Sequence, residues 1–307
     1  MAQTQQFTRE IKMEKEYAYS EIFYSMQGEG KYTGEPTAWL RFFLCNLQCD
    51  GFGQKDPTKP ETYELPYQDI VATDYDRIED LPVFAYGCDS SYSWSKKFKH
   101  LQHKSTPAVI AERILDTIPN RRFDNNIHMC FTGGEPLMKH AQEASVGVMQ
   151  HFTDIGQMVP SVTYETNGTQ PLTEQFLAYW EDDPYTELFF SISPKLWTVA
   201  GERRERAIKP GVVAEYSNLC PESGQLKFVC NGTDDAWKEI EEVVDMYRSV
   251  GVEYPVWIMP IGGTIEGQKG EIDGHPPAHV IADEALARGY RVAARVHAYL
   301  WENIIGK

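Results

Sequence analysis

The sequence predicts an α/β fold whose parallel sheet curls into a partial barrel. Short apolar runs typical of buried strands alternate along the chain with segments whose apolar residues recur at helical spacing. Such alternation indicates strand–helix–strand units, and their right-handed crossovers curl a sheet toward a barrel. About six units are present, too few to close an eight-stranded barrel. Without internal repeats, we expect one domain over residues 17–307, preceded by a polar lead-in over residues 1–16.

The expected strands and helices follow one another in order. Apolar runs place strands at residues 37–44, 127–131, 161–165, 188–192, 226–230, 256–259 and 290–296. One helix is expected after a Thr106 cap, with Pro107 at its first position. Another is expected to begin at an Asp234 cap and to end at Gly251. The remaining helices are expected at residues 138–150, 172–180 and 278–288.

Residues 50–87 interrupt this alternation. The segment is rich in proline and in acidic residues, and its apolar residues are scattered. We interpret it as a long acidic insertion, and loops of such length are usually functional or disordered. It could cover a site, form a dimer surface, or do neither.

Composition limits the classes of function. The net charge of −16 argues against broad affinity for nucleic-acid phosphates. The sequence has no apolar run long enough to span a bilayer, and residues 1–6 lack the apolar core of a secretion signal. We therefore expect a cytoplasmic protein that contacts neither nucleic acid nor membrane directly. Its six cysteines are then reduced thiols or metal ligands rather than disulfides.

Cys45 and Cys49 follow directly after the first expected strand. Active sites of parallel α/β folds lie at this C-terminal edge of the sheet. Thiolates bind zinc and iron–sulfur clusters, but a CxxxC pair alone is a weak signal that favours a structural role, in a helix-turn hairpin or as reduced core cysteines. Cys88, in a Gly-Cys-Asp-Ser loop, adds a third thiol. Three thiolates could hold three irons of a four-iron cluster and leave the fourth iron open.

The segments around these cysteines resemble one family, the 7-carboxy-7-deazaguanine synthases of the radical S-adenosylmethionine superfamily. The resemblance rests on residues 21–30, on residues 34–47 and on residues 88–94, which contain Cys-Asp-Ser followed by Tyr-Ser-Trp. The superfamily motif is CxxxCxxC, whereas 38 residues separate Cys49 from Cys88 here. Either an insertion splits the motif or Cys88 is not a ligand, and the matches on both sides favour the insertion. The resemblance also implies a (βα)6-type partial barrel.

Short polar motifs end the later strands. Each has a plain structural interpretation as a turn or strand exit, although paired glycines also let a ligand approach the backbone and a carboxylate can hold an ammonium group. Lys227 is a charge inside an apolar strand, which is unusual unless paired. The resemblance implies that these positions bind S-adenosylmethionine: Gly133, Gly134, Glu135, Glu165, Thr166, Asn167, Ser193, Pro194, Lys195, Lys227, Met259 and Pro260.

A second set of residues is expected to bind a substrate. The fork of Arg41 suits a carboxylate, and Gln27 and Glu29 can read the donor and acceptor edge of a pterin ring. For Arg41 the alternative is a surface salt bridge, and a lone histidine such as His297 is more often structural. The resemblance assigns the pterin to Gln27, Glu29, Gly30, Arg41, Thr132, Gly133 and His297. It also implies a magnesium ligand at Ser90, while Arg295 and residues 302–305 match the family poorly.

The resemblance implies a lyase of 7-deazapurine (queuosine-type) biosynthesis. It would convert 6-carboxy-5,6,7,8-tetrahydropterin to 7-carboxy-7-deazaguanine and ammonia, with a 4Fe-4S cluster, S-adenosylmethionine and Mg²⁺. No catalytic residue beyond the cluster and cofactor is implied. An electron donor such as flavodoxin or ferredoxin and a homodimer are expected as well. The alternatives are another radical enzyme, such as a glycyl-radical activase, or a catalytically silent iron–sulfur or zinc protein. The Gln-Gly-Glu-Gly segment at residues 27–30 argues against an activase.

Overall fold

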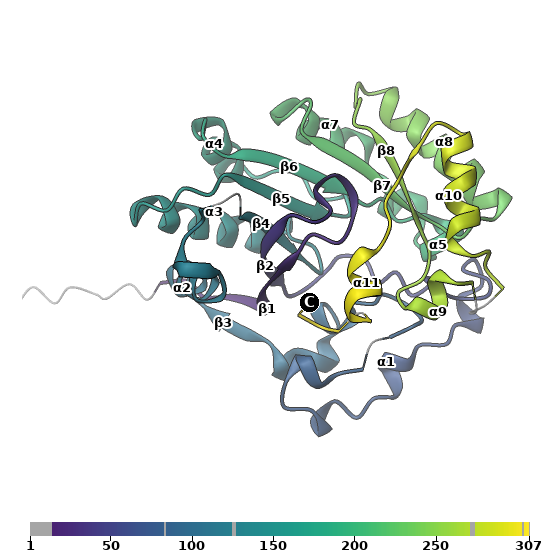
Figure 1. Cartoon of the computed structure of the whole chain (residues 1–307), viewed down its shortest axis with the longest axis horizontal. Helices are drawn as coiled ribbons and strands as arrows, with labels where there is room; N and C mark the ends of the chain where they lie inside the picture. The colour runs from purple at the N-terminus through teal and green to yellow at the C-terminus, as the bar shows by residue number, and fades with distance from the viewer. Residues whose placement is uncertain (1–13, 83, 125–126, 271–273, 303, 307) are drawn as a thin grey trace, which may run out of the picture.

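The chain folds around one curved sheet (Figure 1). A computed structural model describes residues 14–82, 84–124, 127–270, 274–302 and 304–306, so most of the expected lead-in lies outside the described residues. Within them the sheet has nine strands in the order β3-β1-β2-β4-β5-β6-β7-β8-β9. The strands are β1 (Tyr17–Met26), β2 (Pro36–Phe42), β3 (His103–Ser105), β4 (His128–Gly133), β5 (Ser161–Thr166), β6 (Glu187–Ile192), β7 (Gly224–Cys230), β8 (Val256–Pro260) and β9 (Arg291–Val292).

The connections between strands confirm the predicted partial barrel. Strands β2 and β4 to β9 are parallel neighbours in chain order, so six crossovers join them. Figure 1 shows the longer crossover helices outside the curved sheet and the C-terminal helix on its inner side. The helices are α1 (Pro66–Asp69), α2 (Pro107–Thr117), α3 (Lys139–Asp154), α4 (Glu174–Asp182), α5 (Trp197–Ala200), α6 (Arg204–Ala207), α7 (Pro210–Leu219), α8 (Asp234–Arg248), α9 (Ile265–Gln268), α10 (Ala278–Ala287) and α11 (Val296–Trp301). None of these described helices has the length and apolar character needed to cross a membrane.

Three expectations about local structure need correction. The cap of α8 is Thr233, whose hydroxyl accepts the Ala236 amide, so Asp234 is the first helical residue rather than the cap. Strand β9 covers only Arg291–Val292, because the chain leaves the sheet before beginning α11 at Val296. The sequence analysis also missed β1, which pairs antiparallel with β2 and β3.

A row of aromatic rings in the core sets which side chains face the site. Phe131 of β4, Tyr164 of β5 and Phe190 of β6 lie in register on adjacent strands, with ring centroids 5.0 and 6.0 Å apart. All three rings are fully buried. Because side chains alternate along a strand, the next residues, Thr132 and Glu165, point to the opposite face. The outer face of the sheet is therefore core, and its inner face is free to build a cavity.

The inserted segment is folded. Its scattered apolar residues form a small core of their own together with three residues that follow Cys88. This core consists of Tyr67, Ala72, Ile78, Leu81 and Phe84 from the insertion and of Tyr92, Phe98 and Leu101 after it. The two ends of the insertion meet, because the Gly87 amide donates to the Phe52 carbonyl at 2.7 Å. The insertion is thus a closed loop that leaves the barrel and returns at one point.

Candidate active site

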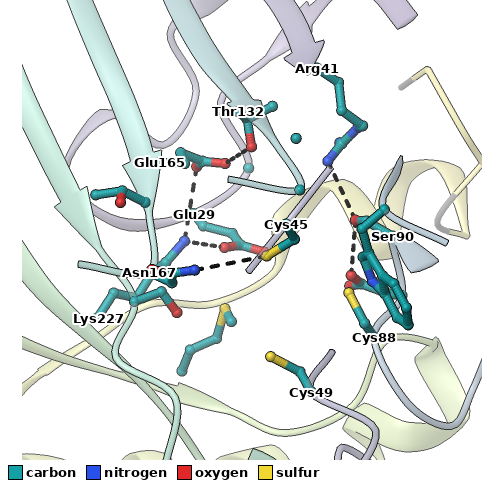
Figure 2. Close-up of a pocket in the computed structure, with 18 of the residues that line it drawn as sticks. Glu29, Arg41, Cys45, Cys49, Cys88, Ser90, Thr132, Glu165, Asn167 and Lys227 are labelled. Carbon is teal, nitrogen blue, oxygen red and sulfur yellow. Dashed lines mark hydrogen bonds and ion pairs between the residues drawn. The ribbon is translucent and has the colours of Figure 1, made fainter. Parts of the chain in front are cut away.

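A polar cavity of about 240 Å³ lies at the C-terminal ends of the parallel strands, the edge predicted from the sequence (Figure 2). Most of the predicted site residues line it: Gln27, Glu29, Arg41, Cys45, Cys49, Cys88, Ser90, Thr132, Gly133, Gly134, Glu165, Thr166, Asn167, Ser193, Lys195, Lys227, Met259 and His297. Gly30, Glu135, Pro194 and Pro260 are outside this lining. Gly30 is buried against Gln225, and Pro260 lines an adjoining hollow.

The three expected ligand cysteines face this one cavity (Figure 2). Residue 52, where CxxxCxxC would have its third cysteine, is phenylalanine. The Phe52–Gly87 contact closes the insertion at that point and brings Cys88 to the site. The other three cysteines lie elsewhere: Cys130 and Cys230 are buried on β4 and β7, and Cys220 ends α7.

The chemistry of the three thiols fits a cluster. Burial raises the pKa of Cys45 to about 12 and that of Cys88 to about 11, and raises the pKa of Cys49 well above its ordinary value. Thiolates in this setting therefore require a bound cation to compensate their charge. Across the described part of the chain, no three His, Cys, Asp or Glu side chains converge on a position for a single metal ion. A structural zinc site needs such convergence, whereas cluster thiolates each bind a different iron.

Glycine is required at residues 133 and 134 for close backbone packing, which could not be seen from the sequence. A Cβ atom on Gly133 would lie 2.4 Å from the Phe42 amide nitrogen and carbonyl oxygen. One on Gly134 would lie 2.1 Å from the Leu44 carbonyl oxygen. The end of β4 thus packs directly on the backbone that leads into the cysteine loop, where Leu44 has a φ of 90°. The glycines serve this backbone contact, in addition to bordering the cavity.

Glu135 is fully buried and braces the strand ends. One carboxylate oxygen accepts from the Leu137 amide at 2.9 Å and the Thr166 hydroxyl at 2.7 Å, and the other accepts from the Asn167 amide at 2.8 Å. Its side chain joins the end of β4 to the end of β5 and does not reach the cavity.

The cysteine loop is held from the opposite side by Glu202, which the sequence analysis missed. One carboxylate oxygen of Glu202 accepts the amides of Gln48 and Cys49 at 2.8 and 2.9 Å. Beside it, the Gly51 amide donates to the Ala200 carbonyl at 3.0 Å. These bonds fix Cys49 in a left-handed conformation with a φ of 57°. No local sequence signal links residue 202 to the cysteines.

Asn167 joins the cysteine loop to the end of β5. Its amide donates to the Asn46 side-chain oxygen at 3.0 Å and approaches the Cys45 sulfur at 3.8 Å. Just after the end of β6, Lys195 donates to the Ser193 hydroxyl at 2.9 Å, and its ammonium lies 5.5 Å from the Phe52 ring centroid. These groups surround the thiols with polar side chains.

The end of the cavity away from the thiols is lined by hydrogen-bond donors and acceptors. The Glu165 carboxylate accepts from the Thr132 hydroxyl at 3.1 Å and from the Gln27 amide at 3.2 Å. Gln27 in turn accepts the Glu29 backbone amide at 3.0 Å. Lys227 forms ion pairs with both Glu29 and Glu165, which explains a charge within an apolar strand.

Glu29 is surrounded by cations. Burial would raise its pKa, but Lys227, Arg295 and His297 outweigh that effect and hold the pKa well below its ordinary range. Burial would likewise lower the pKa of Lys227, yet Glu29 and Glu165 raise it. Glu29 is therefore an acceptor-only carboxylate that borders the cavity.

Arg41 is anchored within the protein while it borders the cavity. Its Nε donates to Glu21 at 2.6 Å, and the Tyr92 hydroxyl donates to the same carboxylate oxygen at 2.8 Å. The Arg41 Nη1 lies 3.4 Å from the Ser90 hydroxyl oxygen. The surface salt bridge considered as an alternative is wrong, because both partners are largely buried.

Arg295, in the segment that matches the family poorly, is part of the site. Its Nη2 donates to Asp89 at 2.8 Å, and its Nε lies 3.3 Å from Glu29. It thereby joins the residue after Cys88 to the end of the cavity that contains Glu29. The only sequence signal was its position two residues before His297, which borders the same cavity.

Comparisons with known proteins agree with this architecture. No family model matches the chain. The chain is 25% identical over 290 residues to the 7-carboxy-7-deazaguanine synthase of Pyrobaculum aerophilum, covering 94% of this chain and 96% of that protein. It is 26% identical to the same enzyme of Halobacterium salinarum, covering 92% and 90%. The crystal structure of QueE from Escherichia coli superposes with a TM-score of 0.50 and 16% sequence identity, over 92% of this chain and 95% of that one.

The structural comparison bears on the fold alone. The superposition confirms the α/β partial barrel expected for a radical S-adenosylmethionine protein. Within that class, the expected resemblance to the 7-carboxy-7-deazaguanine synthases is confirmed along nearly the whole chain.

Proposed function

We propose that the chain is a radical S-adenosylmethionine enzyme that converts 6-carboxy-5,6,7,8-tetrahydropterin to 7-carboxy-7-deazaguanine with release of ammonia. The observation that carries this proposal is the convergence of Cys45, Cys49 and Cys88 on a cavity whose other end holds Glu29 and Arg41. The relatives that cover the chain bear the name of this activity. The reaction is redox-neutral overall, since the pterin loses only the elements of ammonia.

Cys45, Cys49 and Cys88 hold a 4Fe-4S cluster. The cluster and S-adenosylmethionine, when bound, supply the radical chemistry that the side chains cannot provide. The Gly133–Gly134 backbone, Ser193 and Lys195 border the cavity beside the thiols, where they orient the cofactor. Orientation of the reacting groups and exclusion of water are the contributions of the protein.

The substrate occupies the end of the cavity away from the thiols. Gln27 and the ionised Glu29 meet the donor and acceptor edge of the pterin ring, and Arg41 binds its carboxylate. Arg41 can do so because Glu21 fixes its Nε edge and leaves the other edge toward the cavity. Thr132 and His297 border the same space.

A magnesium ion completes the site at Ser90. Hydroxyl oxygens are hard ligands of the kind that Mg²⁺ prefers. Arg41 and Arg295 already place two guanidinium groups beside Ser90 and its neighbour Asp89, so the substrate carboxylate supplies the negative charge that such an ion needs. The enzyme works in the cytoplasm as a homodimer and takes its electron from a donor such as flavodoxin or ferredoxin.

The decisive experiment is anaerobic turnover. Reconstituted, dithionite-reduced protein is incubated with S-adenosylmethionine and the carboxypterin, and the product is followed by ultraviolet absorbance and mass spectrometry. We expect 7-carboxy-7-deazaguanine and ammonia in equal amounts. Cofactor cleavage without this product would identify a different radical enzyme, and no cleavage by cluster-loaded protein would identify a silent metal protein.

A further inference from the structure

The side chain of Asn167, which follows β5, uses its entire hydrogen-bonding capacity within the protein. Its Oδ1 accepts from the Thr169 amide at 3.1 Å and from the Thr169 hydroxyl at 2.6 Å. Its Nδ2 donates to the Asn46 Oδ1 at 3.0 Å and to the Cys45 sulfur at 3.8 Å (Figure 2). A side-chain amide has two donor hydrogens and two acceptor positions. No part of this side chain is therefore left to bind a cofactor hydroxyl.

The surrounding bonds fix which end of the amide faces the sulfur. The Thr169 backbone N–H can only donate, so the Asn167 atom that it meets must be the oxygen. The Thr169 hydroxyl donates to the same oxygen and accepts from the Asn46 Nδ2 at 2.9 Å, which turns the Asn46 oxygen toward Asn167. Asn167 is only 4% exposed, so water competes little for these bonds. The two Nδ2 hydrogens are thus directed at Asn46 and at Cys45.

A second N–H group faces the same sulfur. The Leu47 backbone amide donates to the Cys45 sulfur at 3.4 Å. One-electron reduction adds negative charge to an iron–sulfur cluster and its thiolates. An N–H that points at a thiolate sulfur therefore stabilises the reduced state more than the oxidised state. Hydrogen bonds to the sulfurs are accordingly among the factors that set the reduction potential of such clusters.

We infer that Asn167 raises the reduction potential of the cluster by donating a hydrogen bond to the Cys45 thiolate. This inference rests on the proposed function, in which Cys45 is one of three cluster ligands. Asn167 is then a positioning residue that acts through Cys45, and it binds neither iron nor cofactor itself. It makes the transfer of an electron from the external donor more favourable. The Leu47 amide belongs to the backbone, so Asn167 is the donor that a substitution can remove.

The reduction potential of reconstituted protein tests this role. A redox titration is followed by the paramagnetic signal of the reduced cluster without S-adenosylmethionine, so the readout does not depend on turnover. Asn167→Ala removes the donor, and we expect reduction to become roughly tenfold less favourable, which lowers the potential by about 59 mV. Asn46→Ala is the matched control, because it removes the bond between the cysteine loop and Asn167 but retains the contact with Cys45. Its potential should equal that of the wild type.

A spectroscopic measurement identifies the donor directly. Asparagine is labelled with ¹⁵N in its side-chain amide, and the reduced cluster is studied by pulsed electron paramagnetic resonance. We expect coupling to a side-chain nitrogen in the wild type and in Asn46→Ala, and its loss in Asn167→Ala. The wild-type spectrum decides the question even if Asn167→Ala does not retain its cluster.

Three results would overturn the inference: an unchanged potential in Asn167→Ala, an equal shift in Asn46→Ala, or a wild-type spectrum without the coupling. Failure of the proposed function gives different results. Wild-type protein that holds a cluster but does not cleave S-adenosylmethionine would refute the proposed function alone. Wild-type protein that holds no 4Fe-4S cluster after reconstitution would refute both.

Discussion

The cavity has two walls that are built in different ways. The sheet wall consists of side chains at the ends of adjacent strands, such as Thr132 and Glu165, which hydrogen-bond directly to each other. The loop wall consists of the cysteine loop, the insertion and the C-terminal segment. Single contacts between distant parts of the chain hold it, such as Glu202 with Cys49 and Asp89 with Arg295.

This difference indicates which substitutions should affect the site without affecting the stability of the fold. Residues of the sheet wall inherit their positions from strand register and from the aromatic core behind them. Residues of the loop wall depend on a few polar contacts and on small apolar clusters that are separate from the main core. Changes in the loop wall should therefore alter cofactor or substrate binding with little effect on global stability.

The largest effect is expected for substitutions of the three cysteines, which test whether the loop wall binds the cluster. Cys88→Ala should abolish the brown colour, the bound iron and the activity, as should loss of Cys45 or Cys49, because each thiolate binds one iron. Iron analysis and visible absorbance after anaerobic reconstitution measure this. Cys220→Ala is the control and should retain the cluster. A cluster that survives in Cys88→Ala would show that the split motif is wrong.

Arg41→Lys tests the sheet wall at the end of the cavity where the substrate is expected. One ammonium cannot reproduce a bidentate fork or the bond to Glu21, so we expect the KM for the carboxypterin to rise roughly tenfold or more. Uncoupled cleavage of S-adenosylmethionine should persist. Steady-state kinetics with thermal unfolding as a control separates binding from stability. An unchanged KM would mean that Arg41 serves structure alone.

Glu202→Gln tests the contact that holds the cysteine loop. Hydrogen bonds to a charged acceptor are stronger than those to an amide, so we expect roughly tenfold weaker retention of iron. The readout is iron per chain after desalting over a range of chelator concentrations. Asp183→Asn is a matched control, because the Asp183 carboxylate accepts the amides of Tyr185 and Thr186 in the loop before β6, at the opposite edge of the sheet from the cysteines. Equal iron loss in both variants would contradict a specific role for Glu202.

Ser90→Ala is expected to have the smallest effect. Loss of the hydroxyl should reduce the stimulation of turnover by magnesium a few-fold and leave the cluster intact, because the hydroxyl oxygen is the expected ligand. The family that the sequence resembles has threonine at this position. Serine lacks the methyl group that stiffens threonine, so magnesium binding is expected to be weak already in the wild type. Turnover is measured across magnesium concentrations and with chelator. If chelator has no effect on the wild type and the variant behaves identically, there is no magnesium site at Ser90.

The sheet wall could largely be predicted from the sequence. The strands before Thr132, Glu165 and Lys227 are apolar runs with clear limits, and alternation fixes the face on which these residues lie. Strand β1 was missed, because buried Glu21 interrupts its apolar pattern and only its pairing with Arg41 explains it.

The three cysteines of the loop wall were predicted, but the contacts that hold this wall were not, because they join residues without a local pattern. Nothing in the sequence near Arg295 indicates Asp89, and nothing near Glu202 indicates Cys49. The contact between Phe52 and Gly87 was hidden for the same reason, since it is a property of the folded insertion. Such contacts depend on long-range packing rather than on propensity or periodicity.

The closed stem of the insertion also has an entropic consequence. Ordering Cys88 beside Cys49 across 38 residues, instead of the two of the usual motif, costs roughly 2.5 kcal/mol more in loop closure. Burial of a single large apolar side chain contributes about 1.5–3 kcal/mol, and the insertion buries several, among them Ile78, Leu81 and Phe84. The loop can therefore offset its own closure cost before any iron binds.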